Sequence, residues 1–215
     1  MGVSTETAGY SDSWDPVKTL PPTRPQLDRS EKVAQILDAA ELRLRSAGAD
    51  ALSVSGVARD LGLAQNAVYW YFPSRAELLV AVLRRTLDDI AARKPRRSRN
   101  IVERVLWFTD QLGPLYELQP AMHDLAREAA VVAEFIDELD ALSERMLANV
   151  FGSRYDGDDL TTAIDGFRAT VVGAYARGLS RAKRRRLLAF VLTQLLAGEA
   201  RADARASPEV LRDAR

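Results

Sequence analysis

The 215-residue sequence has no cysteine, which excludes disulfides and thiolate metal sites. No apolar run approaches the ~20 residues that a membrane-spanning helix needs. The start, MGVSTETAGY, lacks the basic and apolar regions of a secretory signal. There is also no Gly-rich phosphate loop, and the single histidine has no spaced set of metal ligands near it. These absences favour a cytoplasmic protein that is not an enzyme, uses no cofactor or metal and does not contact a membrane.

The sequence also lacks net charge, because 30 Lys and Arg residues balance 30 Asp and Glu residues. The charges are unevenly distributed, however. Residues 28–99 contain 13 basic and 9 acidic residues, whereas residues 100–215 contain 15 basic and 18 acidic ones. A positive excess in the first half is expected of a domain that contacts phosphates.

Two segments suggest the domain boundaries. Residues 1–27 contain four of the nine prolines and predict a flexible N-terminal tail, with a DNA-contacting arm as the alternative. Residues 93–99, RKPRRSR, are five-sevenths basic and predict a connector, or else a contact to flanking phosphates. We therefore expect domains at 28–92 and 100–202, followed by a tail at 203–215.

Between these boundaries apolar residues recur at three- and four-residue steps, and no segment alternates with a period of two. The fold class is therefore predicted to be all-α. Helix-start residues, glycines and prolines predict the limits of the helices. The expected helices are 29–47, two short ones within 53–72, 74–92, 100–116, 120–130, 133–151, 158–179 and 180–201.

The segment 53–72, SVSGVARDLGLAQNAVYWYF, predicts two short helices that meet at a tight turn. Ala58 and Gly62 are small enough for the crossing, and Val68 and Phe72 can pack inward. The other side chains of the second helix then face outward: Gln65, Asn66, Tyr69, Trp70 and Tyr71. Amides can bond adenine edges and tyrosine hydroxyls can bond phosphates, so this helix is predicted to enter a DNA groove.

These residues resemble the TetR family of transcriptional regulators. The resemblance runs over about 50 residues in the correct order and spacing. Its main segments are Ile36-Leu37-x-Ala39-Ala40, Leu52-Ser53-Val54, Val57-Ala58-x-x-Leu61-Gly62-Leu63, Ala67 to Arg75, and Glu77-Leu78-Leu79. It implies an N-terminal three-helix DNA-binding domain and a C-terminal helical domain for effector binding and dimerisation.

The resemblance also implies residue roles. Gln65, Asn66 and Ala67 stand where family members contact base edges, and Tyr69 stands where a phosphate is bound. Trp70 and Tyr71 occupy positions where an aromatic residue and a histidine are common. Arg75 replaces a phosphate-contacting lysine, and Ser53 and Ser55 begin the preceding helix, where hydroxyls can reach the DNA backbone.

Two positions depart from the family pattern. Ala64 stands where a capping Ser or Thr is common, so that helix should start more weakly. Tyr71 replaces the common histidine, which leaves the operator sequence open. The alternative for Tyr69, Trp70 and Tyr71 is that they are simply core aromatics.

The last two predicted helices carry more apolar surface than one core requires. Leu160, Ile164, Phe167 and Val171 form one stripe, and a stripe of small residues lies beside it. We predict a homodimer through the helices at 158–179 and 180–201, which the resemblance also implies; a wider monomer core is the alternative. The basic run 181–186, RAKRRR, opens the last helix. We expect it to be salt-bridged, with Asp156, Asp158 and Asp159 as candidate partners.

The middle helices offer large apolar and aromatic side chains for an effector pocket, although each is individually common in a core. The candidate pocket residues are Trp107, Gln111, Met122, His123, Met146 and Phe167. The sequence thus predicts a dimeric regulator that binds double-stranded DNA at a near-palindromic operator and is released by an unidentified small molecule, most simply a repressor. The alternative is a helical interaction protein of the same fold that has lost specific DNA binding.

Overall fold

A computed structural model describes residues 24–93 and 100–197, and within them the chain forms nine α-helices, one 3-10 helix and no strand. This confirms the all-α prediction. The helices are α1 (Arg24–Ala47), η1 (Ala49–Ala51), α2 (Val54–Asp60), α3 (Gln65–Tyr69), α4 (Arg75–Arg93), α5 (Ile101–Gln111), α6 (Gly113–Ala126), α7 (Ala130–Phe151), α8 (Gly157–Ala176) and α9 (Arg181–Ala197). Most of the predicted N-terminal tail, the connector beyond Arg93 and the predicted C-terminal tail lie outside the described residues.

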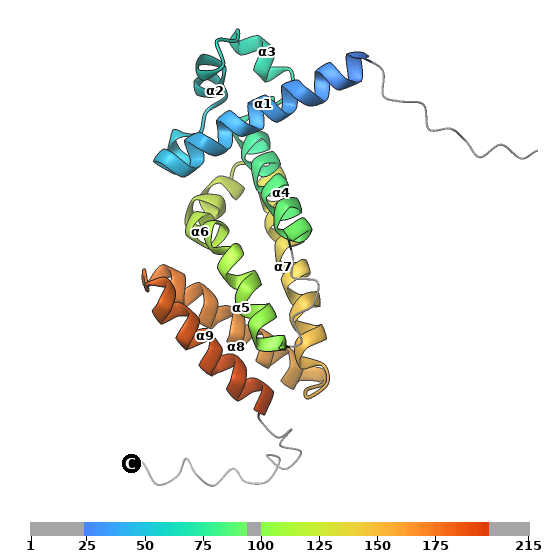
Figure 1. Cartoon of the computed structure of the whole chain (residues 1–215), viewed down its shortest axis with the longest axis vertical. Helices are drawn as coiled ribbons and strands as arrows, with labels where there is room; N and C mark the ends of the chain where they lie inside the picture. Colours follow the sequence, from blue (N-terminus) through green and yellow to red (C-terminus); the bar gives the residue numbers. More distant parts are fainter. Residues whose placement is uncertain (1–23, 94–99, 198–215) are drawn as a thin grey trace, which may run out of the picture.

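The molecule is elongated, with α1, α2 and α3 at one end and α8 and α9 at the other (Figure 1). The long helices α4 and α7 lie side by side between the two ends (Figure 1). No helix of the described segments is long and apolar enough to cross a membrane.

Two clusters of buried apolar side chains hold these helices together. The first joins α1, α2, α3 and α4 and continues onto α6 and α7, where Leu115 and Phe135 belong to it. The second joins α5, the end of α7, α8 and α9, with Phe151 and Leu192 completely buried. The N-terminal helices are therefore packed directly against the C-terminal ones.

Several predicted helix starts have the expected capping contacts. The Ser53 Oγ accepts a hydrogen bond from the backbone N–H of Gly56 at 3.0 Å, and the Ser74 Oγ accepts one from Glu77 at 3.1 Å. Asn100 caps α5 in the same way, accepting from the backbone N–H of Val102 at 2.9 Å. Each of these bonds satisfies a backbone donor that the first helical turn leaves unpaired.

The first helix starts before the predicted boundary at residue 28. It begins at Arg24, with Pro25 in its first turn. Proline is well tolerated there because the first-turn N–H has no partner within the helix. Pro25, the last proline of the predicted tail, therefore lies inside the first helix and close to its start.

The prediction of one helix over 100–116 and another over 120–130 was wrong. The chain breaks at Leu112, and Pro114 lies in the first turn of α6 rather than in the last turn of α5. Pro120 lies inside α6, which continues to Ala126. Both prolines fit the same rule for first turns, so the sequence did not reveal which of them starts the helix.

The other long helices differ from the predictions by a few residues at their ends. One such difference is at the end of α8, predicted near Leu179 but observed at Ala176. There Gly178 adopts a φ of 60°, and its N–H donates to the Tyr175 carbonyl at 2.8 Å. A left-handed glycine ends many helices in this way, because it turns the chain without a side-chain clash.

The basic run at the start of α9 is salt-bridged as expected, but not to the expected acidic residues. Arg181 pairs with Asp110 at 3.2 Å, and Arg185 pairs with both Asp110 and Glu103. These partners lie on α5, whereas Asp156, Asp158 and Asp159 lie at the other end of α8. The arginines therefore fix α9 against α5, a contact between helices that sequence spacing alone does not show.

Candidate functional site

The turn between α2 and α3 places a very short helix on the surface. Gly62 adopts a φ of 63°, which only glycine adopts without strain, and the N–H of Leu63 donates to the Ala58 carbonyl at 2.9 Å. Val68 and Phe72 anchor α3 in the first apolar cluster, and Val68 is completely buried. Two apolar side chains one helical turn apart thus fix which face of α3 points outward.

The outward face carries the residues predicted to read DNA. Gln65, Asn66 and Ala67 are exposed at the start of α3, where Ala64 provides no side-chain cap. Tyr69 is 42% exposed and Trp70 66% exposed. The amide side chains of Gln65 and Asn66 therefore lie at one exposed end of α3.

The three aromatic residues are not equivalent. Trp70 meets Tyr71 edge to face with ring centroids 4.8 Å apart, and the guanidinium of Arg29 lies over the Trp70 ring at 5.0 Å. Tyr71 is half-buried against the first cluster, whereas Tyr69 and Trp70 are among the large side chains that stay exposed. Arg29 on α1 thus adds a cation beside α3, a contact that the sequence analysis did not identify.

Two of the predicted phosphate-contacting side chains already have partners within the domain. Ser53 uses its Oγ to cap α2. Arg75 donates from Nη2 to the Ala49 carbonyl at 2.8 Å and lies 3.5 Å from Asp50. Ser55 is half-buried in the first turn of α2. In the absence of DNA, Ser53 and Arg75 therefore stabilise the loop and helix starts around α3.

A further arginine, which the sequence analysis missed, holds α2 against α1. Arg43 donates from Nη2 to Asp60 at 2.8 Å, and a second bond joins its Nε to the same carboxylate. The hydrogen bond from Arg43 lowers the pKa of Asp60 below its ordinary value. Gly56 lies beneath, where a Cβ atom would stand 2.6 Å from Arg43 Nη1. The acidic residue 17 positions after an arginine gave no local signal for this pair.

The charge of this region changes the sequence-based interpretation. Residues 28–93 contain nine basic and nine acidic residues. The whole positive excess of residues 28–99 therefore comes from Lys94, Arg96, Arg97 and Arg99. These four residues lie outside the described segments. The described residues from 28 to 93 therefore have no net charge, and the exposed side chains of α3 are amides and aromatics, with Arg29 beside Trp70.

A second candidate site lies inside the molecule, between α4, α5, α6, α7 and α8. Two neighbouring cavities of about 1030 and 680 Å³, including the solvent at their mouths, share part of their lining. The shared residues are Leu112, Tyr116, Leu139, Ser143 and Arg168.

The predicted pocket residues divide between these cavities. Met122 and His123 line the smaller cavity, and Met146 and Phe167 line the larger one. Trp107 and Gln111, both half-buried on α5, line neither cavity.

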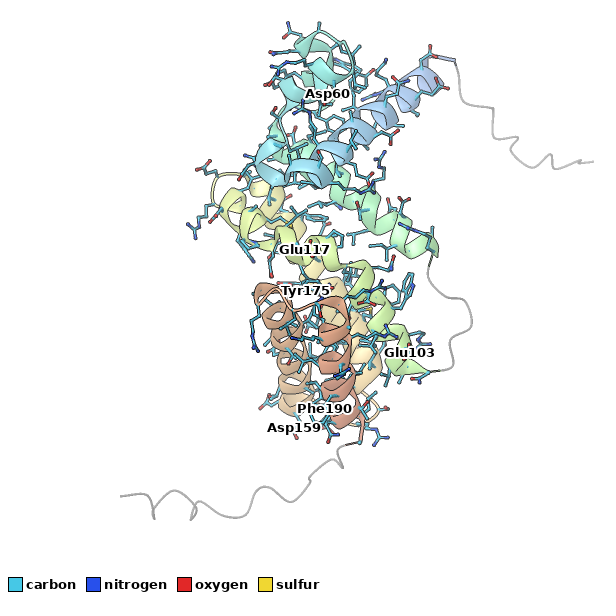
Figure 2. The ribbon with its side chains drawn as sticks, turned by 60° about the vertical axis from the view of Figure 1, so that its left-hand side comes forward. Asp60, Glu103, Glu117, Asp159, Tyr175 and Phe190 are labelled. Atoms are coloured by element: carbon cyan, nitrogen blue, oxygen red, sulfur yellow. The ribbon has the colours of Figure 1, made fainter. Side chains whose placement is uncertain are left out.

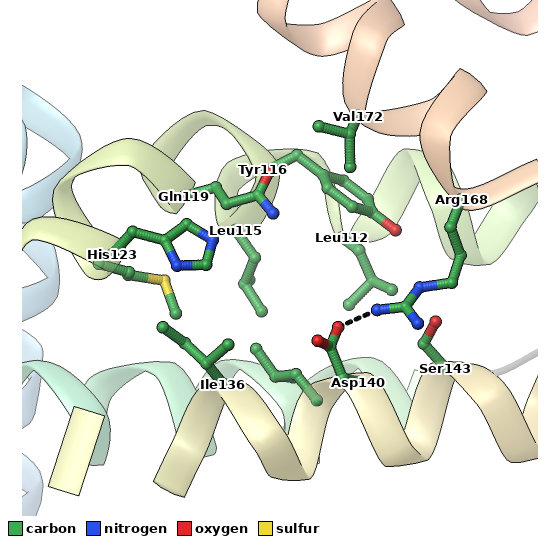
Figure 3. A pocket seen from close by; sticks show the side chains of 12 residues that line it. Leu112, Leu115, Tyr116, Gln119, His123, Ile136, Asp140, Ser143, Arg168 and Val172 are labelled. Carbon is green, nitrogen blue, oxygen red and sulfur yellow. Dashed lines mark hydrogen bonds and ion pairs between the residues drawn. The ribbon is translucent and has the colours of Figure 1, made fainter. Parts of the chain in front are cut away.

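Arg168 and Asp140 form an ion pair where the two cavities meet, and Figure 3 shows the Tyr116 hydroxyl directed towards it. Burial raises the pKa of Tyr116 to about 12, so this phenol remains a neutral donor at ordinary pH. Arg168 was not among the pocket residues predicted from the sequence. Its position, one turn after Ile164 and one turn before Val172, places a charge beside an apolar stripe, and this was the available signal.

At the other end of the molecule, among the described residues of α8 and α9, one large apolar side chain remains exposed. Phe190 on α9 is 63% exposed, and Figure 2 shows it far from Asp60 at the α2 end. On α8 a Cβ atom added at Gly166 or Gly173 would meet nothing within 4 Å. Part of the predicted small-residue stripe therefore faces away from the core of this chain.

Among the described residues, no three histidine or acidic side chains lie close enough together to hold a metal ion.

Comparison with known proteins links these features to a family. Residues 36–82 match the profile of bacterial regulatory proteins of the tetR family. The HTH-type transcriptional repressor KstR of Rhodococcus jostii strain RHA1 is 28% identical over 126 residues, which cover 56% of this chain and 59% of that repressor. The match therefore spans less than two thirds of the length of this curated relative.

Solved structures share the fold. A transcriptional regulator from Rhodococcus sp. Rha1 superposes with a TM-score of 0.66 at 18% identity, covering 78% of this chain and 97% of that one. A regulator from Saccharomonospora viridis in complex with choline gives a TM-score of 0.63 at 16% identity, covering 76% and 96%. The matched segment 36–82 includes α2, the turn and α3, whose geometry is described above. Residues 36–82, which carry this geometry, therefore match the tetR family of bacterial regulatory proteins.

Proposed function

We propose that this protein is a dimeric DNA-binding repressor that leaves its operator when a small molecule occupies the cavities between α4 and α8. The observation that carries the proposal is the exposed face of α3, where amides and aromatic side chains remain outside while Val68 and Phe72 hold the helix in place. The related KstR protein is a transcriptional repressor, which supports the same direction of regulation.

In this proposal α3 enters the major groove of DNA. Gln65, Asn66 and Ala67 contact base edges, because they occupy the exposed first turn of the helix. Tyr69 and Ser55 contact phosphates, while Trp70 and Tyr71 cover the sugar-phosphate backbone beside them. Ser53 and Arg75 contribute by fixing the loop around the helix, since their side chains already have partners there.

Gel-shift titrations on the DNA upstream of the gene test this proposal. Binding should weaken steeply with salt, as expected when phosphate contacts release counterions. Gln65→Ala should change the preferred base, whereas Tyr69→Ala should weaken binding to all sequences alike; Tyr69→Phe, which keeps the ring, separates the hydroxyl from the packing. If selection from randomised DNA yields no bound sequence, the protein is instead an interaction protein of the same fold.

The exposed Phe190 on α9 and the open space beside Gly166 and Gly173 on α8 support the dimer. Two copies joined through α8 and α9 bury Phe190 and form a four-helix bundle, which places two α3 helices for the half-sites of a near-palindromic operator. Phe190→Glu should give a monomer in sedimentation experiments. Leu42→Glu is the matched control, because Leu42 on α1 is 67% exposed but lies away from α8 and α9. A dimer that persists in Phe190→Glu contradicts the proposed interface.

Release of DNA on ligand binding is explained by α4, which connects the larger cavity to the α1–α3 end. Leu87, Ile90 and Ala91 near its end line the larger cavity, and Arg85 one turn earlier binds Asp38 and Glu41 on α1 at 2.7 and 2.6 Å. A ligand that prefers a different position of α4 therefore also favours a different position of the α1–α3 end. The reciprocal effect provides a measurement: operator DNA should weaken ligand binding by the same factor.

A further inference from the structure

The larger of the two cavities has an unusual distribution of polar groups. Its walls are formed by leucine, isoleucine, valine, phenylalanine and methionine side chains of α4, α5, α7 and α8. Among the described residues that line it, Arg168 is the one charged side chain. Asp140, the partner of Arg168, lines the smaller cavity but not the larger one. A molecule in the larger cavity thus meets apolar walls and a single cation, Arg168, where the two cavities share their lining.

The ion pair is asymmetric in its exposure. The Arg168 side chain is 31% exposed, whereas the Asp140 side chain is 57% exposed. If a ligand separates the pair, Asp140 can turn into solvent and recover its hydration there. Arg168 would remain beside apolar walls, where an unpaired charge is unfavourable. Replacement of Asp140 by a ligand anion therefore costs less than replacement of Arg168 by a ligand cation.

Two uncharged groups at the same place also suit an anion. The hydroxyl of Tyr116 is directed towards Arg168, and the Ser143 hydroxyl lies beside the guanidinium (Figure 3). Both residues line both cavities. Hydroxyl donors next to an arginine provide the hydrogen bonds that a carboxylate accepts.

We infer that the cavities bind an elongated apolar carboxylic acid whose body fills the larger cavity and whose carboxylate lies on Arg168 in place of Asp140. This inference rests on the proposed function, since it assigns a chemical class to the effector of that same site. It also gives Asp140 a role in the ligand-free protein, where it neutralises Arg168 until an acid arrives.

Calorimetric titration with three probes of equal chain length tests the inference: decanoate, decan-1-ol and decyltrimethylammonium, each below the concentration at which it forms micelles. Decanoate should bind the full-length protein at least tenfold more tightly than the other two. Tighter binding of decyltrimethylammonium, or equal binding of all three, overturns the inference.

Two variants with opposite expected effects exclude a merely structural explanation. Arg168→Gln should weaken decanoate about tenfold and leave decan-1-ol unchanged. Asp140→Asn should tighten decanoate several-fold, because the competing carboxylate is gone. The control is Arg154→Gln, since Arg154 is an exposed arginine that lines neither cavity. If Arg168→Gln behaves like Arg154→Gln, or if Asp140→Asn weakens decanoate, the carboxylate does not lie on Arg168.

Binding and release are measured separately so that the two proposals can fail independently. Decanoate that binds through Arg168 without weakening the operator complex supports the acid site and contradicts effector release. Release of DNA by decan-1-ol or decyltrimethylammonium alone supports effector release and contradicts the acid site.

Discussion

Around α3 the apolar side chains are buried and the polar and aromatic ones lie on the outer surface, whereas between α4 and α8 apolar side chains line cavities and an ion pair lies where those cavities meet. The first region presents side chains on an outer surface, and the second surrounds internal space. Side chains at the two places therefore contribute differently to stability, even when they are the same residue type. Substitutions matched across the two regions can test this contrast.

Two leucines give the largest expected difference. Leu79 on α4 is 1% exposed within the first cluster, while Leu139 on α7 lines both cavities. Leu79→Ala should lower the free energy of unfolding by about 2–5 kcal/mol, because it leaves a new void in a packed core. Leu139→Ala should cost less than about 2 kcal/mol, since it enlarges space that already exists. Equal losses in urea unfolding would contradict the contrast.

Two glycines give the next effect. Gly56→Ala places a Cβ 2.6 Å from Arg43 Nη1 and 2.7 Å from Ser53 Oγ, so it should lower stability by about 1–3 kcal/mol through overpacking. Gly166→Ala meets open space on α8 and should raise stability by about 0.5–1 kcal/mol. The second variant is best measured together with Phe190→Glu, so that the proposed dimer does not contribute. If both substitutions lower the free energy of unfolding by similar amounts, close packing around Gly56 is not the cause of its loss.

Adjacent arginines on α4 give a smaller effect, and each connects to a different region. Arg85 binds two carboxylates of α1 and its side chain is 25% exposed; Arg84 binds Glu138 of α7 and is 49% exposed. Arg85→Gln should lower stability by about 1 kcal/mol, and Arg84→Gln by less.

The effect of Arg84→Gln should depend on pH. The guanidinium of Arg84 lowers the pKa of Glu138, so their pair stabilises the fold above the ordinary pKa of a glutamate. That contribution is lost as the pH falls through the lowered pKa of Glu138. Chemical unfolding of wild type and Arg84→Gln at neutral and acidic pH should therefore show curves that converge in acid. A constant difference would mean that the pair is not the cause.

Tyr116 gives an effect that is confined to alkaline pH and is absent under ordinary conditions. Its pKa in the folded chain is about 12, above the ordinary 10, so the folded state retains a proton that the unfolded chain releases. Stability should therefore fall as the pH rises from about 10 to about 12, and Tyr116→Phe should reduce this loss. A residual slope remains, because burial also raises the pKa of Tyr175. If wild type and Tyr116→Phe lose the same stability between about pH 10 and 12, the Tyr116 hydroxyl is in contact with water and burial does not raise its pKa.

The contrast between the α3 surface and the cavities between α4 and α8 also explains which features could be predicted from the sequence. The burial pattern of α3 was predicted well for buried Val68 and Phe72 and for exposed Tyr69 and Trp70, which follow the period of one helix, whereas Tyr71, predicted to face outward, is half-buried. The all-α fold and the capping residues Ser53, Ser74 and Asn100 follow from equally local rules.

The cavity was less predictable, since it forms where five helices meet and depends on their relative positions. Trp107 on α5 and Met146 on α7 are both large apolar side chains of the middle helices, so the sequence favoured them equally. Of the two, Met146 lines the larger cavity and Trp107 does not. Arg168 went unnoticed because its partner Asp140 is 28 residues away. The break at Leu112 was missed for a different reason: two nearby prolines fit the same rule. Contacts between helices, rather than patterns within them, account for most of what the sequence did not show.

The 19-residue helix α4 has a geometrical consequence for both regions. At 1.5 Å per residue it is a rod of roughly 28 Å, with cavity-lining residues near its end and the first apolar cluster around its start. A tilt of about 10° about one end of such a rod displaces the other end by roughly 5 Å. A change in cavity shape that is barely larger than a bond length can thus become, at the far end, a displacement comparable to the rise between neighbouring helical turns.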